Sequence, residues 1–469
     1  MSATAERMTR VDHAWLRMDN DVNLMMIVGV WLLQPALRYE EVCRRIEQRL
    51  LQYPRFRQKV VEDALGASWV HDEDFDITRH VVREVLPRRR GQSERAALQA
   101  RCGELATTRL DPSRPLWQFH LVEHYESGSA IIVRIHHCVG DGIALTSVVL
   151  SITDGGALPP QRSHDAVHDE ADWLSTTLIR PLTDLAVKAI DLSGESVSRT
   201  ADLMSHPQAG IGELARTGVR VATDLAALAL MEDDSPTLLK GKPVGRKLVA
   251  WGEPIPLDVV KSIGKALGAS INDVLLACAA GAIGDYLREI GDQPAGKGIR
   301  AMVPVNLRPL DEAYKLGNRF GLAPLVLPIG IDNPVERVFE VRERMGHLKG
   351  SYQPVLAFGV LAVAGLLNKG GQDALLNLFA KKATAVMTNV PGPTRLLKFC
   401  GATLRQSIFW VPQSGDVAVG VSIFSYGGGV QFALIADEQL CPEPQQIIDR
   451  FAPELDKLLW LTLMLPWAA

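Results

Sequence analysis

A strand that ends in two histidines is the feature that most restricts how this chain folds. Residues 129–145 read SAIIVRIHHCVGDGIAL. The β-branched run favours a buried strand, the Gly-Asp-Gly group favours a turn, and the residues after it favour a helix. We therefore expect a strand that ends at His136 and His137, then a tight turn, then a short helix from about Ile143 to Ile152.

Strand geometry separates the two histidines. Successive side chains of a strand point to opposite faces, so His136 and His137 cannot easily chelate one metal ion. The same alternation turns Cys138 away from His137, which disfavours a nucleophilic Cys–His pair. What remains is one functional histidine, supported by its neighbour. An imidazole with an ordinary pKa of about 6.5 is well suited to taking and returning a proton at neutral pH.

The rest of the motif also has a simpler, structural interpretation. Asp141 is a good helix N-cap, and Gly140 and Gly142 are good turn formers, without any catalytic role. Taken singly, these residues favour that interpretation. Two histidines, three free positions and Asp-Gly together are expected by chance in roughly one such chain in a thousand. The rarity of the pattern favours a functional interpretation.

Length and patterning predict more than one domain. The chain has 469 residues, 47% of them hydrophobic and 22% charged, which is the balance of a globular protein. Strand and helix patterns alternate in both halves, and a Gly-, Pro- and charge-rich stretch with amphipathic helical spacing separates them. We expect an α/β domain with the motif over residues 1–160, a helical linker over 161–235, and a second α/β domain over 236–469.

Charge and cysteine usage exclude several classes of protein. The formal net charge is −4, so we expect no nucleic-acid partner. Two basic clusters, YPRFRQKV and LPRRRGQSER, are either solvated surface or contacts for the phosphates of a nucleotide-bearing cofactor or anionic lipid. The six cysteines form no CxxC pair, which argues against a zinc cluster or a disulfide framework. With no apolar signal-peptide core near the N-terminus, we expect a cytoplasmic protein.

The longest apolar runs are too short to span a membrane. They cover residues 354–367 and 458–469, whereas a spanning helix needs roughly 20 residues. Each run is explained by burial in the core or by contact with a lipid surface.

HHCVGDG resembles the HHxxxDG signature of the CoA-dependent acyltransferase superfamily, which includes chloramphenicol acetyltransferase and the condensation domains of peptide synthetases. Most of the chain is similar to one branch, the bacterial wax ester synthase/diacylglycerol acyltransferase family. The similar segments, in the expected order, are VDHAWLRMD, PRFRQKV, FDITRHV, RPLWQFHLVE, ASINDVLLA, MVPVNLR, GNRFG and TNVPGP. One departure, NLMMIVGVW in place of a Pro-Met-His-Val-Gly-Gly-like segment, bears on substrate preference more than on fold or reaction.

The resemblance implies an α/β fold and a reaction. The fold would be two chloramphenicol-acetyltransferase-like domains, with mixed sheets and flanking helices, a helical linker, and a tunnel between the domains. The reaction would move a long-chain acyl group from acyl-CoA to a fatty alcohol or diacylglycerol, giving wax esters or triacylglycerol. Acyl-CoA is then a co-substrate, and no covalent acyl-enzyme, metal or other cofactor is required.

The resemblance also assigns roles within the motif. His137 would be the general base that deprotonates the acceptor hydroxyl, and His136, Asp141 and Gly142 would support it. The Asp141 carboxylate would turn away from the substrate and pair with an arginine, for which Arg57 and Arg308 are the candidates.

Two further residues would position substrate. Asn272 would be the polar residue of the second domain nearest the reaction, as a donor to substrate or oxyanion; alternatively it caps the helix that follows it. Trp117 would pack the tunnel wall beside the motif, although a large aromatic residue is more often part of a core.

Other functions stay open at this point. One alternative is an acyltransferase for a specialised acceptor of polyketide or peptide type. Another is a non-catalytic lipid-binding protein of the same fold. For the first function we expect peripheral contact with the inner face of the membrane or with lipid inclusions, such as lipid droplets.

Overall fold

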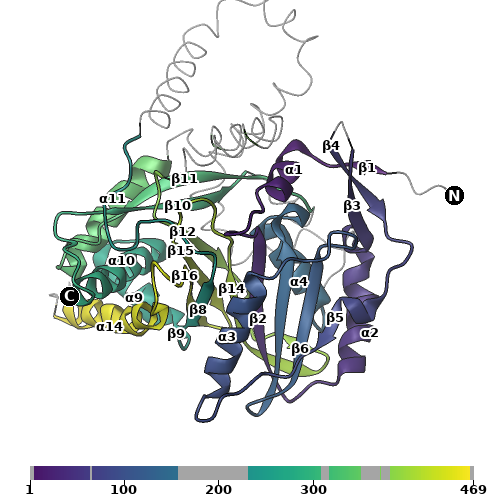
Figure 1. The fold of residues 1–469 in the computed structure, drawn as a ribbon. Helices are drawn as coiled ribbons and strands as arrows, with labels where there is room; N and C mark the ends of the chain where they lie inside the picture. The colour runs from purple at the N-terminus through teal and green to yellow at the C-terminus, as the bar shows by residue number, and fades with distance from the viewer. Residues whose placement is uncertain are drawn as a thin grey trace, which may run out of the picture.

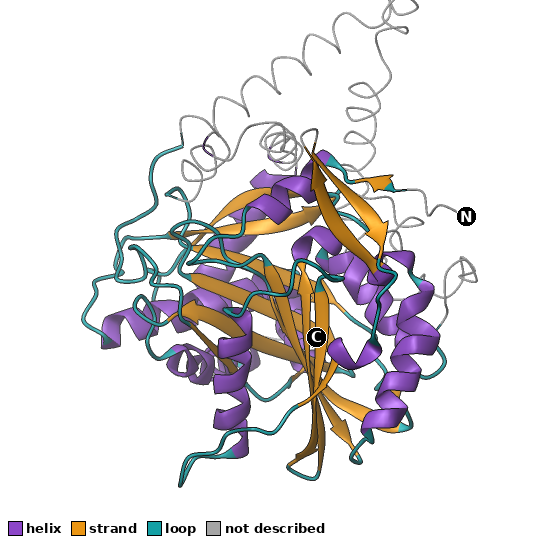
Figure 2. Cartoon of the chain, turned by 45° about the vertical axis from the view of Figure 1, so that its right-hand side comes forward, coloured by secondary structure: helices purple, strands orange, loops and turns teal. Residues whose placement is uncertain are grey.

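The computed structural model describes residues 5–63, 66–156, 231–307, 316–349 and 381–464, with two isolated positions, 357 and 370. Most of the predicted linker, Arg308 and the apolar run 354–367 lie outside the described residues. The described part has an α/β fold of two large mixed sheets flanked by helices, with a small third sheet near the N-terminus (Figure 1). Figure 2 shows the strands running through the middle of the molecule, with helices on the outer sides.

The first sheet has six strands in the order β13-β14-β2-β7-β6-β5. They are β13 (Lys398–Phe399), β14 (Ala402–Trp410), β2 (Met26–Gln34), β7 (Gly128–His136), β6 (Trp117–Tyr125) and β5 (Val81–Arg83). Neighbouring strands are antiparallel except β5 and β6, which are parallel. Every residue of β7 is buried, so the strand that carries the motif is covered on both faces.

The described residues of the first half of the chain form four α-helices: α1 (Arg10–Arg17), α2 (Tyr39–Arg49), α3 (Glu94–Ala106) and α4 (Gly142–Ile152). The strand β7 ends at His136, a 3-10 turn covers His137–Val139, and α4 begins at Gly142. The predicted strand, turn and short helix are therefore all present. Asp141 is the N-cap of α4, because its side chain accepts a hydrogen bond from the Ala144 N–H.

The second sheet has seven strands in the order β11-β10-β12-β15-β16-β8, with β9 paired to β16. They are β11 (Phe320–Leu327), β10 (Ile299–Asn306), β12 (Ala385–Pro391), β15 (Val419–Tyr426), β16 (Gly429–Asp437), β8 (Lys247–Trp251) and β9 (Ile255–Pro256). Among the described residues, four helices lie on one side of this sheet (Figure 1). They are α9 (Leu257–Leu267), α10 (Ile271–Glu289), α11 (Pro334–Lys349) and α14 (Pro444–Leu463).

Among these helices, α10 is a core helix. Most of its residues are buried, and its N-terminus is closed by a capping box in which Ser270 and Asp273 satisfy each other's backbone N–H groups. In the described part of the chain, no single helix is long and apolar enough to cross a membrane. The bent pair α9 and α10 passes the same length and composition test together, with 101° between the two helices.

The strand β14 joins the two domains. It comes from the second half of the chain but pairs with β2 in the first sheet, with Trp410 opposite Val28 and Leu404 opposite Leu33. Its position in the sequence predicts that this strand belongs to the second domain, since its neighbours in the chain lie there. Its own side-chain periodicity does not specify which sheet edge it joins. The residue boundaries of the three predicted segments stay a prediction.

The small third sheet consists of β1 (Glu6–Arg7), β4 (Gly66–His71) and β3 (Gln58–Asp63), in that order. It leads the chain into α1, which contacts the turn after β7. The N-terminal segment therefore lies beside the motif, as Figure 1 shows for α1 and α4.

Candidate active site

The chain leaves the sheet after β7, and the two histidine side chains there meet different neighbours. The His137 N–H donates to the Met25 carbonyl over 2.7 Å, which holds the chain as it leaves the sheet. The Cys138 N–H donates to Nδ1 of His136 over 3.1 Å. As strand alternation predicts, His136 meets a carboxylate, whereas His137 lies among aromatic rings.

His137 is enclosed by two aromatic side chains. Its ring stacks on Trp15, with centroids 4.2 Å apart and planes 15° apart, and the ring of Phe320 lies 5.5 Å away. Only 6% of His137 is exposed. Burial lowers the pKa of His137 to about 4, although the nearby Asp141 carboxylate acts in the opposite direction. Its Nδ1 atom is buried and has no hydrogen-bond partner among the described residues.

His136 has polar surroundings. Its Nε2 lies 3.2 Å from Oδ1 of Asp19, and this same oxygen accepts the Met25 N–H over 2.6 Å. Burial disfavours the charged form of His136, but Cys138 and Asp19 raise its pKa above the ordinary value. Since Nδ1 accepts a backbone N–H, Nε2 is the nitrogen that carries a proton toward Asp19.

Asp141 fixes the shape of the motif loop. Its Oδ1 accepts the Ala144 N–H and its Oδ2 accepts the Arg319 N–H, each over 3.0 Å. An arginine thus contacts this carboxylate through its backbone. Of the two predicted partners, Arg57 forms no ion pair with Asp141 among the described residues, and Arg308 lies outside them. The N-cap interpretation of Asp141 and its support of the loop are compatible, because each uses a different oxygen.

Two segments that are distant in sequence hold the motif from outside. Oδ1 of Asp12, in α1, accepts both the N–H and the side-chain amide of Asn318, over 2.9 and 2.8 Å. The same amide nitrogen donates to the His137 carbonyl over 2.8 Å. Sequence reasoning did not single out Asp12, Trp15, Asn318 or Phe320. Their only signal was membership of VDHAWLRMD and GNRFG, the segments that carried the resemblance.

An apolar pocket begins at Gly142 and lies between the first sheet, α4 and β15. From β7 it takes Val133 and Ile135, which share one face of the strand; His137 follows in the 3-10 turn and is not among the described lining residues. No described residue that lines it is charged. Its lining residues are Ile27, Gly29, Trp31, Val133, Ile135, Gly142, Leu145, Thr146, Val149, Leu150, Leu397, Leu404, Ser407, Ile408, Phe409, Val411, Phe424 and Tyr426.

Trp117 lies in the core of the first domain. It is fully buried, its Nε1–H donates to the Phe56 carbonyl over 2.9 Å, and its ring stacks on His80 at 4.4 Å. It is not among the described residues that line the apolar pocket. Its role toward substrate stays a prediction.

Asn272 lies at the start of α10, but it does not cap that helix. The N-cap is Ser270, so the alternative that gave Asn272 this role is wrong. The side chain of Asn272 is buried, and its Oδ1 accepts a hydrogen bond of 2.6 Å from Asn389. This bond joins the NDVLLA and TNVPGP segments. Among the described residues, no hydrogen bond links Asn272 to the motif.

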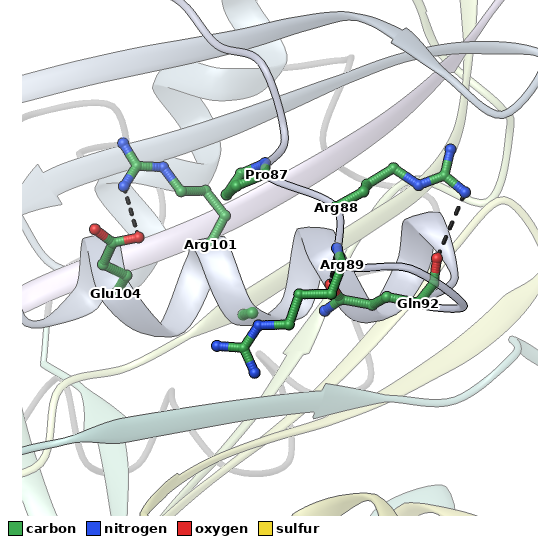
Figure 3. Close-up of a pocket in the computed structure, with 7 residues that line it drawn as sticks. Pro87, Arg88, Arg89, Gln92, Arg101 and Glu104 are labelled. Atoms are coloured by element: carbon green, nitrogen blue, oxygen red, sulfur yellow. Dashed lines mark hydrogen bonds and ion pairs between the residues drawn. The ribbon is translucent and has the colours of Figure 1, made fainter.

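Several residues of the two basic clusters, and Arg101 beside them, pair with acidic side chains of the same chain. Figure 3 shows the hollow beside α3, lined by Arg88, Arg89 and Arg101. Arg88 pairs with Glu94 at 2.9 Å, and Arg101 pairs with Glu84 at 3.0 Å and with Glu104 at 2.8 Å.

In the second basic cluster, Arg55 pairs with Glu6 at 2.8 Å and Lys59 pairs with Asp72 at 3.1 Å. These pairs favour the solvated-surface interpretation of both clusters. No described group of three or more His, Cys, Asp or Glu residues could hold a metal ion, and all six cysteines are free thiols.

Comparison with solved structures identifies the fold as that of condensation-type acyltransferases. A wax ester synthase/diacylglycerol acyltransferase from Marinobacter aquaeolei VT8 superposes with a TM-score of 0.66 at 19% identity, covering 97% of this chain and 100% of that one. The first condensation domain of the calcium-dependent antibiotic synthetase gives 0.59 at 16% identity, covering 99% and 97%. A mutant starter condensation domain of rhizomide synthetase, solved with C8-CoA and Leu-SNAC, gives 0.58 at 12%, covering 98% and 95%.

The chain belongs to the wax ester synthase/diacylglycerol acyltransferase family. The catalytic-domain pattern of that family matches residues 8–275, and its C-terminal-domain pattern matches residues 316–459. A probable diacylglycerol O-acyltransferase of Mycobacterium tuberculosis is 26% identical over 453 residues, 94% of this chain and 93% of that one. The wax ester synthase/diacylglycerol acyltransferase 5 of Arabidopsis thaliana is 25% identical, over 92% and 89%. The protein is thus an acyltransferase of this family.

Proposed function

We propose that this acyltransferase moves a long-chain acyl group from acyl-CoA to the hydroxyl of a fatty alcohol or of diacylglycerol, with His137 as the general base. The observation that carries the proposal is an apolar pocket beside the motif. Its described lining has no charged residue and includes Gly142 of the motif and Ile135, two residues before the buried His137. An apolar lining of this kind suits a hydrocarbon chain.

The chemistry needs one proton carrier. The imidazole of His137 takes the proton of the acceptor hydroxyl while its oxygen bonds to the thioester carbonyl carbon. The tetrahedral intermediate then collapses, the carbon–sulfur bond breaks, and the imidazolium returns the proton to the departing sulfur. The products are an ester and CoA, and no bond to the protein forms.

The surroundings of His137 suit this role. A pKa of about 4 keeps the free imidazole uncharged at neutral pH, and burial is the main cause. The same low pKa makes the imidazolium, once formed, a strong acid toward the sulfur.

Contact with lipid is part of the proposal, because the acceptors partition into membranes and lipid inclusions. The end of α14 exposes Trp460, Leu463 and Met464, the last to 78%. Apolar side chains at a helix end are suited to an interfacial position. If so, serine at these three positions lowers co-sedimentation with phospholipid vesicles, and unchanged binding would place the contact elsewhere. A cytoplasmic location remains a prediction.

The proposed reaction is tested by offering acceptors to the purified protein. Labelled palmitoyl-CoA is incubated with fatty alcohols, diacylglycerol and short alcohols, and the products are separated by chromatography. We expect esters from the long-chain acceptors and very little from short ones, because a longer chain buries more apolar surface against an apolar lining.

Each other outcome favours a named alternative. Turnover only with a carrier-protein thioester as donor would favour the specialised-acceptor function. Binding of acyl-CoA without any ester would favour a lipid-binding protein.

A further inference from the structure

Three segments that are far apart in sequence meet at the carbonyl of His137. One is the motif turn, the second is α1, and the third is the loop 316–320, which leads into β11. The loop also pairs with the motif through its backbone: the Gly317 N–H donates to the Val139 carbonyl, and the Asp141 N–H donates to the Gly317 carbonyl, each over 3.2 Å. The motif is therefore held by both halves of the chain.

Asn318 is the centre of this contact. It is only 4% exposed, and its side-chain nitrogen donates to Asp12 Oδ1 and to the His137 carbonyl, each over 2.8 Å. Its backbone N–H donates to the same Asp12 oxygen. Gly317 precedes Asn318 and has a φ of +107°, a conformation that favours glycine. This backbone turn places Asn318 against the motif.

Asp12 is a buried carboxylate that these donors satisfy. It is 2% exposed, and its own N–H is capped by Thr9 Oγ1. A buried carboxylate is costly unless it is hydrogen-bonded, so its retention needs a reason. One helical turn further along α1, Trp15 covers the ring of His137. The same helix thus holds the backbone of His137 through Asp12 and Asn318, and the imidazole through Trp15.

We propose that Asp12 and Asn318 are positioning residues for acyl transfer, and that their hydrogen bonds set the place of the His137 imidazole by holding its carbonyl to α1. This inference rests on the proposed function of His137 as the base. Neither residue contacts the reacting atoms; both act through His137. Since proton transfer needs heavy-atom distances of roughly 3 Å, a small displacement of the imidazole slows the reaction more than it weakens binding.

Single variants test the acceptor, Asp12, separately from the donor, Asn318. Asn318→Ala removes both amide bonds, and we expect kcat to fall about 10- to 100-fold with KM changed less than about threefold. Asp12→Ala removes the acceptor and should lower kcat in the same direction. Asp12→Asn keeps an acceptor oxygen of the same shape, so we expect kcat within about threefold of wild type.

A double variant distinguishes a loss of stability from a loss of positioning of His137. In Asp12→Asn/Asn318→Asp the new amide at position 12 can donate to the new carboxylate at position 318, so the contact between α1 and the loop is restored. The new carboxylate has no N–H for the His137 carbonyl. We expect melting temperature to return toward that of wild type, while kcat stays as low as in Asn318→Ala. Wild-type kcat in the double variant would overturn the proposal.

Ser93→Ala is the matched control for lost stability. Ser93 caps α3 by accepting the Ala96 N–H over 3.1 Å, and it has no contact with the motif. Its removal lowers stability without touching His137. If Ser93→Ala lowers kcat as much as Asn318→Ala, the effect of Asn318 is structural only and the proposal is wrong.

A second readout does not depend on turnover. The ring protons of His137 lie over the indole of Trp15, so in histidine-labelled protein their NMR signals should be displaced by the ring current, and His137→Gln identifies them. We expect these signals to move in Asn318→Ala and to stay in place in Ser93→Ala. If they do not move in Asn318→Ala, the proposal fails whatever the activity. If they move while wild type esterifies no acceptor, the proposed reaction fails and the positioning role stands.

Discussion

His136 and His137 are neighbours in the chain, but the two sides of the β7 end give them opposite surroundings. On one side His136 lies 3.2 Å from the Asp19 carboxylate, with a raised pKa. On the other side His137 packs against Trp15 and Phe320, with a pKa lowered to about 4. The difference teaches that two neighbouring histidines at a strand end can have opposite surroundings. One meets a carboxylate, and the other packs against aromatic rings where burial lowers its pKa.

The largest expected difference between the two sides is in turnover. His137→Gln removes the proposed proton carrier, and we expect kcat to fall about 10²- to 10⁴-fold in the ester-forming assay. His136→Gln keeps an N–H donor toward Asp19 and should lower kcat by no more than about tenfold. Both variants should keep melting temperatures close to wild type. A larger loss in His136→Gln would reverse the assignment of the two histidines.

The pH dependence of stability should also separate the two sides. The unfolded chain protonates His137 at a pKa of about 6.5, but the folded chain does so only near pH 4, since burial excludes the charge. Between these values the unfolded state binds more protons, so the free energy of unfolding falls as the pH falls. We expect this contribution, about 3 kcal/mol, to vanish in His137→Gln.

The check is urea unfolding at several pH values from 7 to 4, in wild type and in His137→Gln. Other histidines with lowered pKa values, such as His80 and His120, contribute equally to both proteins and cancel. An identical pH dependence in the two proteins would show that His137 titrates normally.

Asp19→Ala removes the carboxylate beside His136 and leaves the aromatic neighbours of His137 in place. It leaves the Met25 N–H without its acceptor and removes the carboxylate that faces Nε2 of His136, and we expect the free energy of unfolding to fall by about 1–3 kcal/mol. Because the aromatic side is untouched, kcat should change by less than about tenfold. The measurement combines denaturant unfolding with the ester assay. A loss of kcat as large as that of His137→Gln would mean that the two sides are not independent.

The smallest expected effect on stability comes from a substitution of Trp15, on the aromatic side. Trp15→Phe keeps an aromatic ring over His137 and removes an indole N–H that is buried without a partner among the described residues. The smaller ring leaves a gap, but the lost N–H offsets part of that cost. We expect a change of about 1 kcal/mol or less in the free energy of unfolding. Differential scanning calorimetry would register a greater loss if the indole itself were required.

Local sequence predicted the centre of the site well. The β-branched run, the glycines and the capping tendency of Asp141 are properties of neighbouring residues, and they correctly predicted β7, the turn and α4. Strand alternation placed the two histidines on different sides. The resemblance to the acyltransferase family supplied the fold, which periodicity alone could not distinguish from other α/β arrangements.

The surroundings of the site could not be predicted, for two physical reasons. Contacts such as Asp12 with Asn318 join positions far apart in the chain, and no local periodicity encodes them. One described donor to Oδ2 of Asp141 is the backbone N–H of Arg319, a group that nearly every residue carries. The same limitation explains why β14 was grouped with the second sheet. A strand's pattern indicates which of its faces is buried but not the neighbour with which it pairs.

The central claim is that an uncharged His137 takes the proton, and the pH dependence of kcat/KM tests it most directly. This profile reports the pKa of the base in the free enzyme. We expect kcat/KM with a long-chain alcohol to stay level from neutral pH to about pH 5 and to fall only as the pH approaches 4, because burial holds the imidazole neutral. A fall centred at or above pH 6.5 would contradict the account, since the imidazole would then be charged where the enzyme is required to accept a proton.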